Sequence, residues 1–276
     1  MSGILYLVPT PIGNLGDLSD RVRETLSAVD FIAAEDTRVS LKLLNHLGLK
    51  KPLVSYYEHN RAESGPRILA RLQGGESCAL VTDAGTPAIS DPGQDLVALC
   101  AGADVPVCAI PGPCAAVTAL AASGLPTGRF TFEGFLSTAP KSRREHLDAL
   151  RGERRTMIFY EAPHKLVRTL SDFASVFGPE RRISLCRELT KLHEEILRTT
   201  LGEAAAYYET QAPRGEYVLI LEGAPAPEPV PAPSLADATE RVNALIAQGL
   251  RRKEAVKQVS EALGIPKNTL YEASLP

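Results

Sequence analysis

The 276-residue chain lacks the cysteine and histidine spacings that hold zinc. Its five cysteines form no Cys-x-x-Cys pair and no cluster with histidine. Structural zinc sites are built from such pairs, so we expect no bound metal.

Secretion and membrane patterns are missing as well. Residues 1–8 have neither the basic start nor the long apolar core of a secretory signal. No uninterrupted apolar run approaches the roughly 20 residues of a membrane helix. We therefore expect a cytoplasmic protein in a reducing setting, with no membrane association.

Two common nucleotide motifs are also absent. No Walker Gly-Lys-Ser/Thr sequence is present, which argues against a triphosphate site. No Gly-x-Gly-x-x-Gly follows the first predicted strand, so the usual dinucleotide fingerprint is missing. The formal net charge is −3, and any contact with a nucleic acid must therefore come from local basic patches.

What the sequence does contain is three loops rich in proline and glycine, each directly after a predicted apolar strand. They lie at residues 9–17, 83–93 and 111–113. In open α/β sheets, ligands bind at the carboxyl ends of strands. Glycine allows close approach of the backbone and proline stiffens a loop. Three such loops in corresponding positions favour a crevice for a zwitterionic or nucleoside ligand over three ordinary turns.

Short apolar segments alternate with helical spacing along the first part of the chain. Residues 4–8, 31–34 and 78–82 are predicted strands. Helices are expected between them, such as one that ends before Gly48. This alternation predicts a largely parallel sheet with helical crossovers.

Beyond the third loop the predicted strands become longer. We expect two clear helices among them, at residues 142–150 and 164–177, and hence a mixed or antiparallel second sheet. The expected strands lie at residues 129–136, 156–160, 183–188, 194–201 and 217–221.

The last part of the chain combines a proline-rich segment with a helix-turn-helix pattern. Predicted helices at 235–248 and 252–263 are followed by a third that opens near residue 266. The proline-rich segment is expected to be an extended linker. The predicted parts are an N-terminal α/β domain (1–112), a second α/β domain (113–223) with the ligand cleft between the two, the linker (224–233) and a helical module (234–276).

Several charged residues outside the loops are candidates for chemistry. Glu35 and Asp36, beside Arg38, suit either substrate orientation and proton transfer or the start of a helix, where the helix dipole favours acids. Both interpretations stay open. His59 and His164 are candidate bases, although a lone histidine is more often structural. Basic segments of the second domain are candidates for phosphate binding.

Eight sequence runs together resemble the tetrapyrrole methylases, a family of S-adenosylmethionine (SAM)-dependent methyltransferases. The Asp-Pro-Gly and Pro-Gly loops are shared across that family. The runs at 9–15, 35–38 and 187–191 are narrower and are similar to a subfamily that methylates a cytidine 2′-oxygen in small-subunit ribosomal RNA. The runs are Val-Pro-Thr-Pro-Ile-Gly-Asn-Leu (8–15), Glu-Asp-Thr-Arg (35–38), Asp-Ala-Gly-Thr-Pro (83–87), Ile-Ser-Asp-Pro-Gly (89–93), Pro-Gly-Pro (111–113), Phe-Glu-Gly-Phe-Leu (132–136), Phe-Tyr-Glu-Ala-Pro-His (159–164) and Cys-Arg-Glu-Leu-Thr-Lys (186–191).

The resemblance implies a two-domain tetrapyrrole methylase-like α/β fold, SAM in the cleft between the domains, and a homodimer. The residues that it places at SAM are Pro11, Asp83, Gly85, Thr86, Pro87, Ser90, Pro111, Gly112, Pro113, Phe135, Leu136, Tyr160, Glu161 and Pro163. The catalytic candidates on the acceptor side are Asp36, Glu188 and Lys191. The candidates for RNA binding are Arg38, His59, Lys141 and Arg187.

The expected activity is therefore SAM-dependent 2′-O-methylation of a cytidine in 16S-type ribosomal RNA, within an assembled small subunit. One alternative is a methyltransferase that acts on a small molecule such as a tetrapyrrole. Another is a nucleic-acid-binding ligand sensor. The helical module and the basic second domain favour RNA over a tetrapyrrole. The module carries six Lys and Arg against five Asp and Glu, a balance that argues against the sensor.

Overall fold

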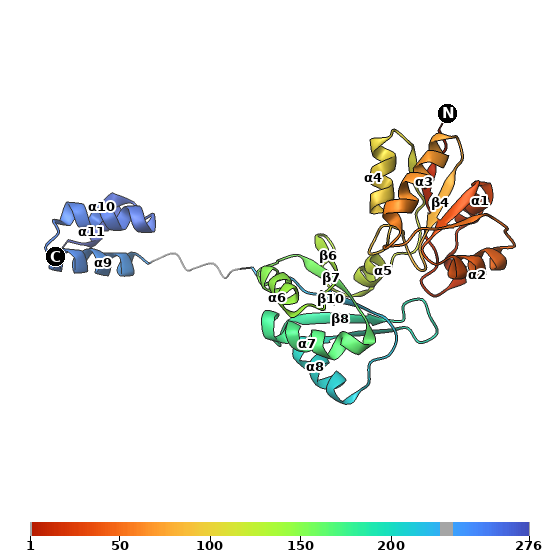
Figure 1. The fold of residues 1–276 in the computed structure, drawn as a ribbon. Helices are drawn as coiled ribbons and strands as arrows, with labels where there is room; N and C mark the ends of the chain where they lie inside the picture. Colours follow the sequence, from red (N-terminus) through yellow and green to blue (C-terminus); the bar gives the residue numbers. More distant parts are fainter. Residues whose placement is uncertain (1, 227–233, 276) are drawn as a thin grey trace. The chain divides into compact units, whose positions relative to one another are not determined.

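The computed structural model describes residues 2–226 and 234–275 (Figure 1). It separates into two compact units, Met1–Ala224 and Pro225–Pro276. Most of the predicted linker, residues 227–233, lies outside the described residues.

The first half of the Met1–Ala224 unit is a parallel five-stranded sheet in the order β3-β2-β4-β1-β5. Strands β2 and β4 are apolar throughout and fully buried, as expected where helices cover both faces. The strands are β1 (Leu5–Leu7), β2 (Phe31–Ala34), β3 (Leu53–Ser55), β4 (Cys78–Val81) and β5 (Val107–Ala109). The helices are η1 (Leu15–Asp17, a 3-10 turn), α1 (Asp20–Ala28), α2 (Thr37–Leu47), α3 (Arg61–Gln73) and α4 (Gln94–Gly102).

The second half is a mixed five-stranded sheet in the order β6-β7-β10-β8-β9, in which only β6 and β7 pair in parallel. Helices α6, α7 and α8 pack on one face, and α5 packs on the other. The strands are β6 (Phe130–Phe135), β7 (Thr156–Glu161), β8 (Arg182–Arg187), β9 (Glu195–Thr200) and β10 (Tyr217–Leu221). The helices are α5 (Ala115–Ala122), α6 (Pro140–Ala149), α7 (Pro163–Phe177) and α8 (Leu201–Thr210). The predicted fold class, a parallel sheet followed by a mixed one, is confirmed.

Helix α8 is a third helix among these strands, where the sequence predicts two, and it begins at Leu201, which lies within the predicted strand 194–201. Thr200 and Glu203 form a capping box, in which each side chain accepts a hydrogen bond from the other residue's backbone. The Thr-x-x-Glu signature of this box is visible in the sequence. Gly202, Tyr207 and Tyr208 are weak helix formers, and for this reason the sequence did not predict a helix here.

The C-terminal unit is a three-helix module with its own core. Ser234 caps the first helix, and Gly264, in a left-handed conformation, ends the second. The helices are α9 (Leu235–Ala247), α10 (Arg252–Leu263) and α11 (Lys267–Ala273). Within the residues that the structure describes, none of the helices has both the length and the apolar character needed to cross a membrane.

Candidate active site

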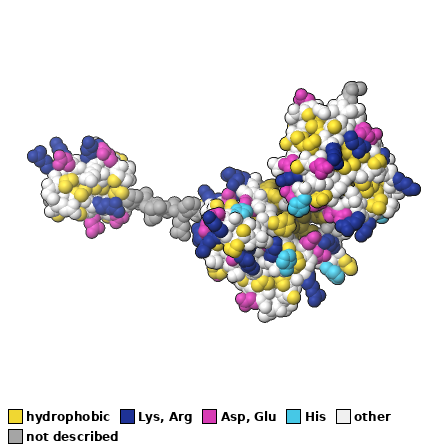
Figure 2. All heavy atoms as spheres, in the orientation of Figure 1, with side chains coloured by type: hydrophobic (Ala, Val, Ile, Leu, Met, Phe, Trp, Pro, Cys, Tyr) yellow, Lys and Arg dark blue, Asp and Glu magenta, His cyan; other side chains and the backbone are white. Residues whose placement is uncertain are grey.

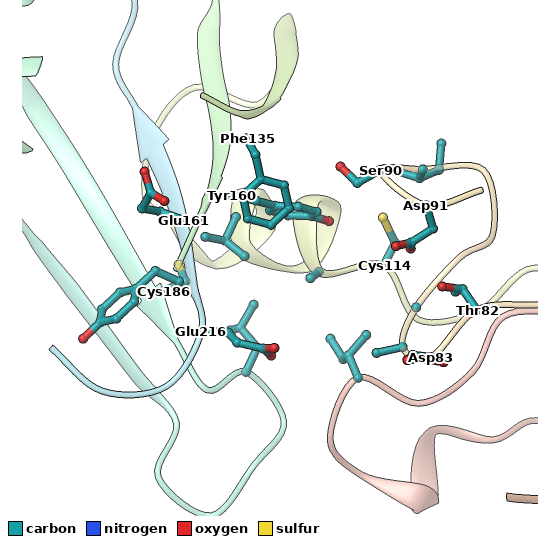
Figure 3. Close-up of a pocket in the computed structure, with 18 of the residues that line it drawn as sticks. Thr82, Asp83, Ser90, Asp91, Cys114, Phe135, Tyr160, Glu161, Cys186 and Glu216 are labelled. Carbon is teal, nitrogen blue, oxygen red and sulfur yellow. The ribbon is translucent and has the colours of Figure 1, made fainter. Parts of the chain in front are cut away.

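A cavity of about 450 Å³ lies in the Met1–Ala224 unit, where loops of the first half meet strands of the second (Figure 3). Hydrophobic side chains are visible in this hollow in Figure 2. From the first half it is lined by Ile12, Glu35, residues 82–86, Ile89, Ser90 and Asp91. From the second half it is lined by Cys114, Ala115, Phe135, residues 160–163, Cys186, Glu188, Leu189, Lys191, Glu216, Tyr217 and Val218.

The first-half wall is held rigid by hydrogen bonds between its loops. The backbone N–H groups of Thr10 and Gly85 each donate to the other residue's carbonyl, over 2.9 and 3.0 Å. The Thr10 hydroxyl donates to the Thr82 carbonyl over 3.0 Å, and the Thr86 hydroxyl donates to the Pro113 carbonyl over 2.8 Å. The three proline- and glycine-rich loops therefore form one structure.

Gly112 sits where two of these loops touch. A Cβ atom added there would lie 2.3 Å from Cγ of Pro9, closer than any van der Waals contact allows. Glycine at this position lets the Pro111–Pro113 loop pack directly on the loop after β1. In this structure its role is loop-to-loop packing, because it does not line the cavity.

The same wall is acidic. Glu35, Asp83 and Asp91 all line the cavity, and Glu35 accepts a hydrogen bond from the Thr82 hydroxyl over 2.7 Å. Burial, reinforced by the charge of Glu35, raises the pKa of Asp91 to about 6. Burial and Glu35 also raise the pKa of Asp83. Carboxylates that repel one another across a cavity favour a cationic ligand between them.

Both walls contain residues other than glycine in the left-handed region of backbone space. Ala88 and Ser90 have φ of +68°, and Glu188 and Thr190 have φ of +51° and +66°. Such conformations cost of order 1–3 kcal/mol each and persist where the surroundings enforce them, commonly at functional sites. Their presence on both sides of this cavity supports its assignment as the functional site.

The second-half wall is aromatic. Phe135 and Tyr160 line the cavity with their ring centroids 5.5 Å apart, and both are labelled in Figure 3. The Tyr160 hydroxyl accepts a hydrogen bond from the Ala116 N–H over 3.1 Å, which ties the ring to the start of α5. The wall presents an aromatic surface opposite the carboxylates.

Glu161 belongs to a buried hydrogen-bond network. One carboxylate oxygen accepts from the Ala162 N–H over 2.9 Å, and the other accepts from the Thr169 hydroxyl over 2.5 Å. Arg143 donates to both Thr169 and Asp172. The carboxylate of Glu161 is thus committed to the interior of the second half and orients the segment that leads into α7.

Lys191 lies between two glutamates at the cavity rim. Its ammonium group is 3.0 Å from Glu188 and 3.3 Å from Glu216. Burial alone would lower the pKa of Lys191, but the hydrogen bond to Glu188 and the two negative charges outweigh it and raise that pKa. The hydrogen bond from Lys191 lowers the pKa of Glu188. At neutral pH, therefore, Lys191 is a fixed cation and Glu188 an anion.

Two glycines make room for this cluster. A Cβ on Gly13 would lie 2.4 Å from Cγ of Lys191, and a Cβ on Gly215 would lie 2.5 Å from Oε1 of Glu188. Gly215 also has φ of +75°. The loop after β1 thus meets the loop after β8 directly.

The structure brings together most of the residues that the sequence placed at SAM. Those that line the cavity are Asp83, Gly85, Thr86, Ser90, Phe135, Tyr160, Glu161 and Pro163. Those that do not line it are Pro11, Pro87, Pro111, Gly112, Pro113 and Leu136. Leu136 is 4% exposed and belongs to the hydrophobic core of the second half, so its neighbour Phe135 alone faces the ligand space.

Among the catalytic candidates, Glu188 and Lys191 line the cavity and Asp36 does not. The Asp36 side chain caps α2 by accepting from the Arg38 N–H over 2.8 Å, and it forms an ion pair with the Arg38 guanidinium. Hydrogen bonds from Arg38 lower the pKa of Asp36 to about 2. Of the two interpretations of Asp36, the geometry therefore agrees with the one that places it at the start of a helix.

The candidates for RNA binding lie outside the cavity lining. Arg38 and His59 are exposed after β2 and β3, at the carboxyl edge of the first sheet. Arg187 pairs with Glu195 over 2.9 Å. Lys141 is exposed on α6, over which Figure 2 shows several basic side chains.

Several lining residues were not singled out from the sequence. Glu35 was a candidate for substrate orientation or proton transfer but was not placed at SAM, and Asp91 was noted only as a polar residue of the 83–93 loop. Thr82, Cys186 and Glu216 were not proposed at all. A polar residue at the carboxyl end of a buried strand, such as Thr82, is a signal that strand analysis offers. Glu216 carries no such signal, because it reaches the cavity through strand pairing.

The chain belongs to the tetrapyrrole (corrin/porphyrin) methylases, whose family model matches residues 4–205, and it is therefore a methyltransferase by family. A second model, the RsmI C-terminal HTH domain, matches residues 233–275.

Relatives named ribosomal RNA small subunit methyltransferase I match nearly the whole chain. The protein of this name from Synechocystis sp. is 50% identical over 99% of this chain and 98% of its own length. Those from Escherichia coli O157:H7 and Bacillus subtilis are 47% and 44% identical, over 99% and 98% of this chain and 95% and 94% of their own lengths.

Solved structures share the fold of the first unit. The methyltransferase CobJ matches with a TM-score of 0.60 and 19% identity, over 81% of this chain and 95% of its own. Uroporphyrin-III-C-methyltransferase from Thermus thermophilus matches with a TM-score of 0.56 and 20% identity, over 79% and 94%. At these identities the likeness concerns the fold alone.

Proposed function

We propose that this protein transfers the methyl group of SAM to the 2′-hydroxyl of a cytidine in small-subunit ribosomal RNA. The observation that carries the proposal is the identity of 44–50% with relatives named ribosomal RNA small subunit methyltransferase I, over almost the full length of both chains. That similarity extends through the C-terminal module, which a small-molecule methylase does not require.

The donor set of the cavity fits SAM, which supplies an activated methyl group on a sulfonium cation. The carboxylates of Glu35 and Asp83 would attract the positive charge of the donor. Phe135 and Tyr160 would pack against its adenine ring. The rigid loop at residues 83–91 would orient the ligand.

The acceptor hydroxyl is a weak nucleophile at neutral pH, so its proton needs an acceptor. Asp36 and Glu188 have lowered pKa values and Lys191 keeps its proton, which makes all three poor bases. We assign them to orienting the ribose and its phosphates, Asp36 through Arg38. Asp91, whose pKa is about 6, is the group that we assign as proton acceptor.

The RNA would lie over the exposed cations Arg38, His59 and Lys141, with Arg187 beside the cavity rim. We further propose that the substrate is an assembled small subunit, that the enzyme acts in the cytoplasm, and that it is a homodimer. A large folded particle accounts for the separate helical module, which offers a second point of contact.

The test offers labelled SAM to the protein together with small subunits that lack the modification, with free ribosomal RNA, or with a tetrapyrrole precursor. Label in one cytidine ribose of the subunit is the expected result. Label in the tetrapyrrole alone would keep the donor site and overturn the RNA substrate. Binding of SAM without transfer to any of the three would favour a ligand sensor.

The role of the module is tested by ending the chain after Ala224. The first unit is compact and has hydrophobic cores of its own, so the shortened protein should fold. We expect at least tenfold weaker binding of the subunit and an unchanged dissociation constant for SAM. Equal loss of both would make the module a structural element.

A further inference from the structure

Strand β6 contains a β-bulge directly before the cavity. Thr131 pairs with Met157 and Phe132 with Ile158, but the next pair is Gly134 with Phe159. Glu133 is therefore an extra residue without a partner on β7. Bulges are uncommon in parallel pairs and often re-aim a side chain next to a functional site.

The bulge decides which residue of β6 reaches the cavity. Side chains alternate between the two faces of a strand, so a shift of one residue moves every later side chain to the opposite face. With the bulge, Phe135 lies opposite Tyr160 and faces the cavity, while Leu136 is buried in the core beneath α6 and α7. Without it, Phe135 would pair with Glu161 and point to the face that holds Phe159.

The backbone conformation of the bulge depends on Gly134, which has φ of +63°. Nothing crowds this position, since an added Cβ would find its nearest atom 3.7 Å away, on Ser90. Glycine is needed here for its conformation and not for space. The backbone conformation of Gly134 alone does not determine the direction in which the Glu133 side chain points.

That direction is held by His146 of α6. The imidazole Nε2 lies 2.9 Å from Oε2 of Glu133, whose side chain is 15% exposed. The His146 ring also lies against Phe159, the residue opposite Gly134, with centroids 6.5 Å apart. Helix α6 thus holds the side chain of Glu133 on the face of the sheet opposite the cavity.

We propose that Glu133 and His146 are positioning residues, whose contact maintains the bulge that directs Phe135 into the cavity. Neither residue lines the cavity, so both act through the phenyl ring of Phe135. The inference rests on the proposed function in one respect: SAM binding is used to report the position of the Phe135 ring. Its specific consequence is that ligand affinity depends on a hydrogen bond on the far face of the sheet.

The chain has no tryptophan, so Phe135→Trp introduces a single tryptophan at the cavity, which can be excited apart from the eight tyrosines. In this background Glu133→Ala removes the contact, and Glu133→Gln keeps an oxygen that can accept from His146. We expect Glu133→Ala to shift the emission to shorter wavelength, because residue 135 leaves a cavity position at which Phe135 is 56% exposed and turns to the buried face that holds Phe159, and to weaken SAM binding at least tenfold. Glu133→Gln should stay within threefold of its parent and keep its emission.

A matched control is Glu63→Ala on α3, which breaks a surface ion pair with Arg67 and should change neither readout. His146→Leu is a second way to remove the contact and should behave as Glu133→Ala does. Unchanged emission and SAM affinity in both variants would overturn the inference. Failure of the unmodified protein to bind SAM would instead count against the proposed function. In that case the emission of the ligand-free variants would still show whether the side chain at position 135 points into the cavity.

Discussion

The two halves of the Met1–Ala224 unit build one cavity by different means. The first half uses loops at the carboxyl ends of parallel strands, stiffened by proline and joined by hydrogen bonds such as that from Thr86 to Pro113. The second half uses single side chains whose directions depend on strand pairing, a bulge and left-handed residues. The first wall is preformed and acidic, whereas the second is aromatic and ends in a charged Glu-Lys-Glu cluster.

The difference indicates a division of labour. A rigid acidic wall suits the part of the site that binds the same small cation in every cycle. The charged Glu188–Lys191–Glu216 cluster at the rim suits the part that receives a large acceptor. Substitutions in the first wall should therefore affect stability and chemistry together, and those in this charged cluster should separate acceptor binding from donor binding.

The largest effect is expected from Asp91→Asn. If Asp91 accepts the proton, turnover should fall about 100-fold. In the parent protein turnover should rise with pH through about 6, the pKa to which burial raises Asp91, and in the variant this rise should be absent. Single-turnover methyl transfer between pH 5 and 8 measures both. An intact pH profile in the variant would exclude Asp91 as the base.

The same variant should be more stable at neutral pH. The ordinary pKa of an aspartate is 3.8, and the folded value is about 6, so the folded state binds the proton more tightly. Ionisation of Asp91 therefore costs stability, increasingly from pH 4 to 6 and fully above pH 6. After allowance for solvent screening, Asp91→Asn should raise the free energy of unfolding by about 1 kcal/mol at pH 7.5 and by nothing at pH 3.5. Urea denaturation at the two pH values provides the comparison.

Lys191→Met should separate the acceptor from the donor. Removal of this cation leaves the negative charges of Glu188 and Glu216 uncompensated at the rim. These two carboxylates then repel RNA phosphates. We expect kcat/KM for the RNA substrate to fall about 30-fold, a loss of about 2 kcal/mol. The dissociation constant for SAM, measured by calorimetry, should stay within threefold. A parallel loss of SAM affinity would mean that Lys191 belongs to the donor site.

Gly112→Ala tests the rigidity of the first wall. The added Cβ would lie 2.3 Å from Pro9 and must force two proline loops apart. We expect a loss of about 2 kcal/mol in the free energy of unfolding, typical of overpacking, together with weaker SAM binding. Gly128→Ala is the control, because nothing lies within 4 Å of a Cβ there. Equal stability of the two variants would show that the loops are not rigid.

Gly215→Ala makes the corresponding test in the second wall and should have the smaller effect. Its Cβ meets the flexible side chain of Glu188, and its φ of +75° disfavours alanine. We expect a loss of about 1 kcal/mol. Gly249→Ala, with φ of +97° and no atom within 4 Å, measures the conformational penalty alone. Any excess at Gly215 reports displacement of Glu188, and identical losses would show that Glu188 moves freely.

The sequence by itself determined what local signals encode. Buried strands read as apolar runs, helix ends were marked by residues such as Gly48 and Ser234, and the loops after β1, β4 and β5 were recognisable from proline and glycine. These patterns were sufficient for the fold class, for the acidic loop and for the position of the cavity at the ends of strands.

Tertiary structure alone decided which neighbouring side chain enters the site. Phe135 and Leu136 are adjacent and both apolar, yet the bulge at Glu133 sends one to the cavity and the other to the core. The positions of Glu161 and Glu216 were likewise not predictable from the local sequence. The Glu161 carboxylate is held in a buried hydrogen-bond network, and pairing between β10 and β8 brings Glu216 to the cavity rim. The physical reason is that strand register and buried polar partners depend on residues far apart in the chain, which a local pattern does not contain.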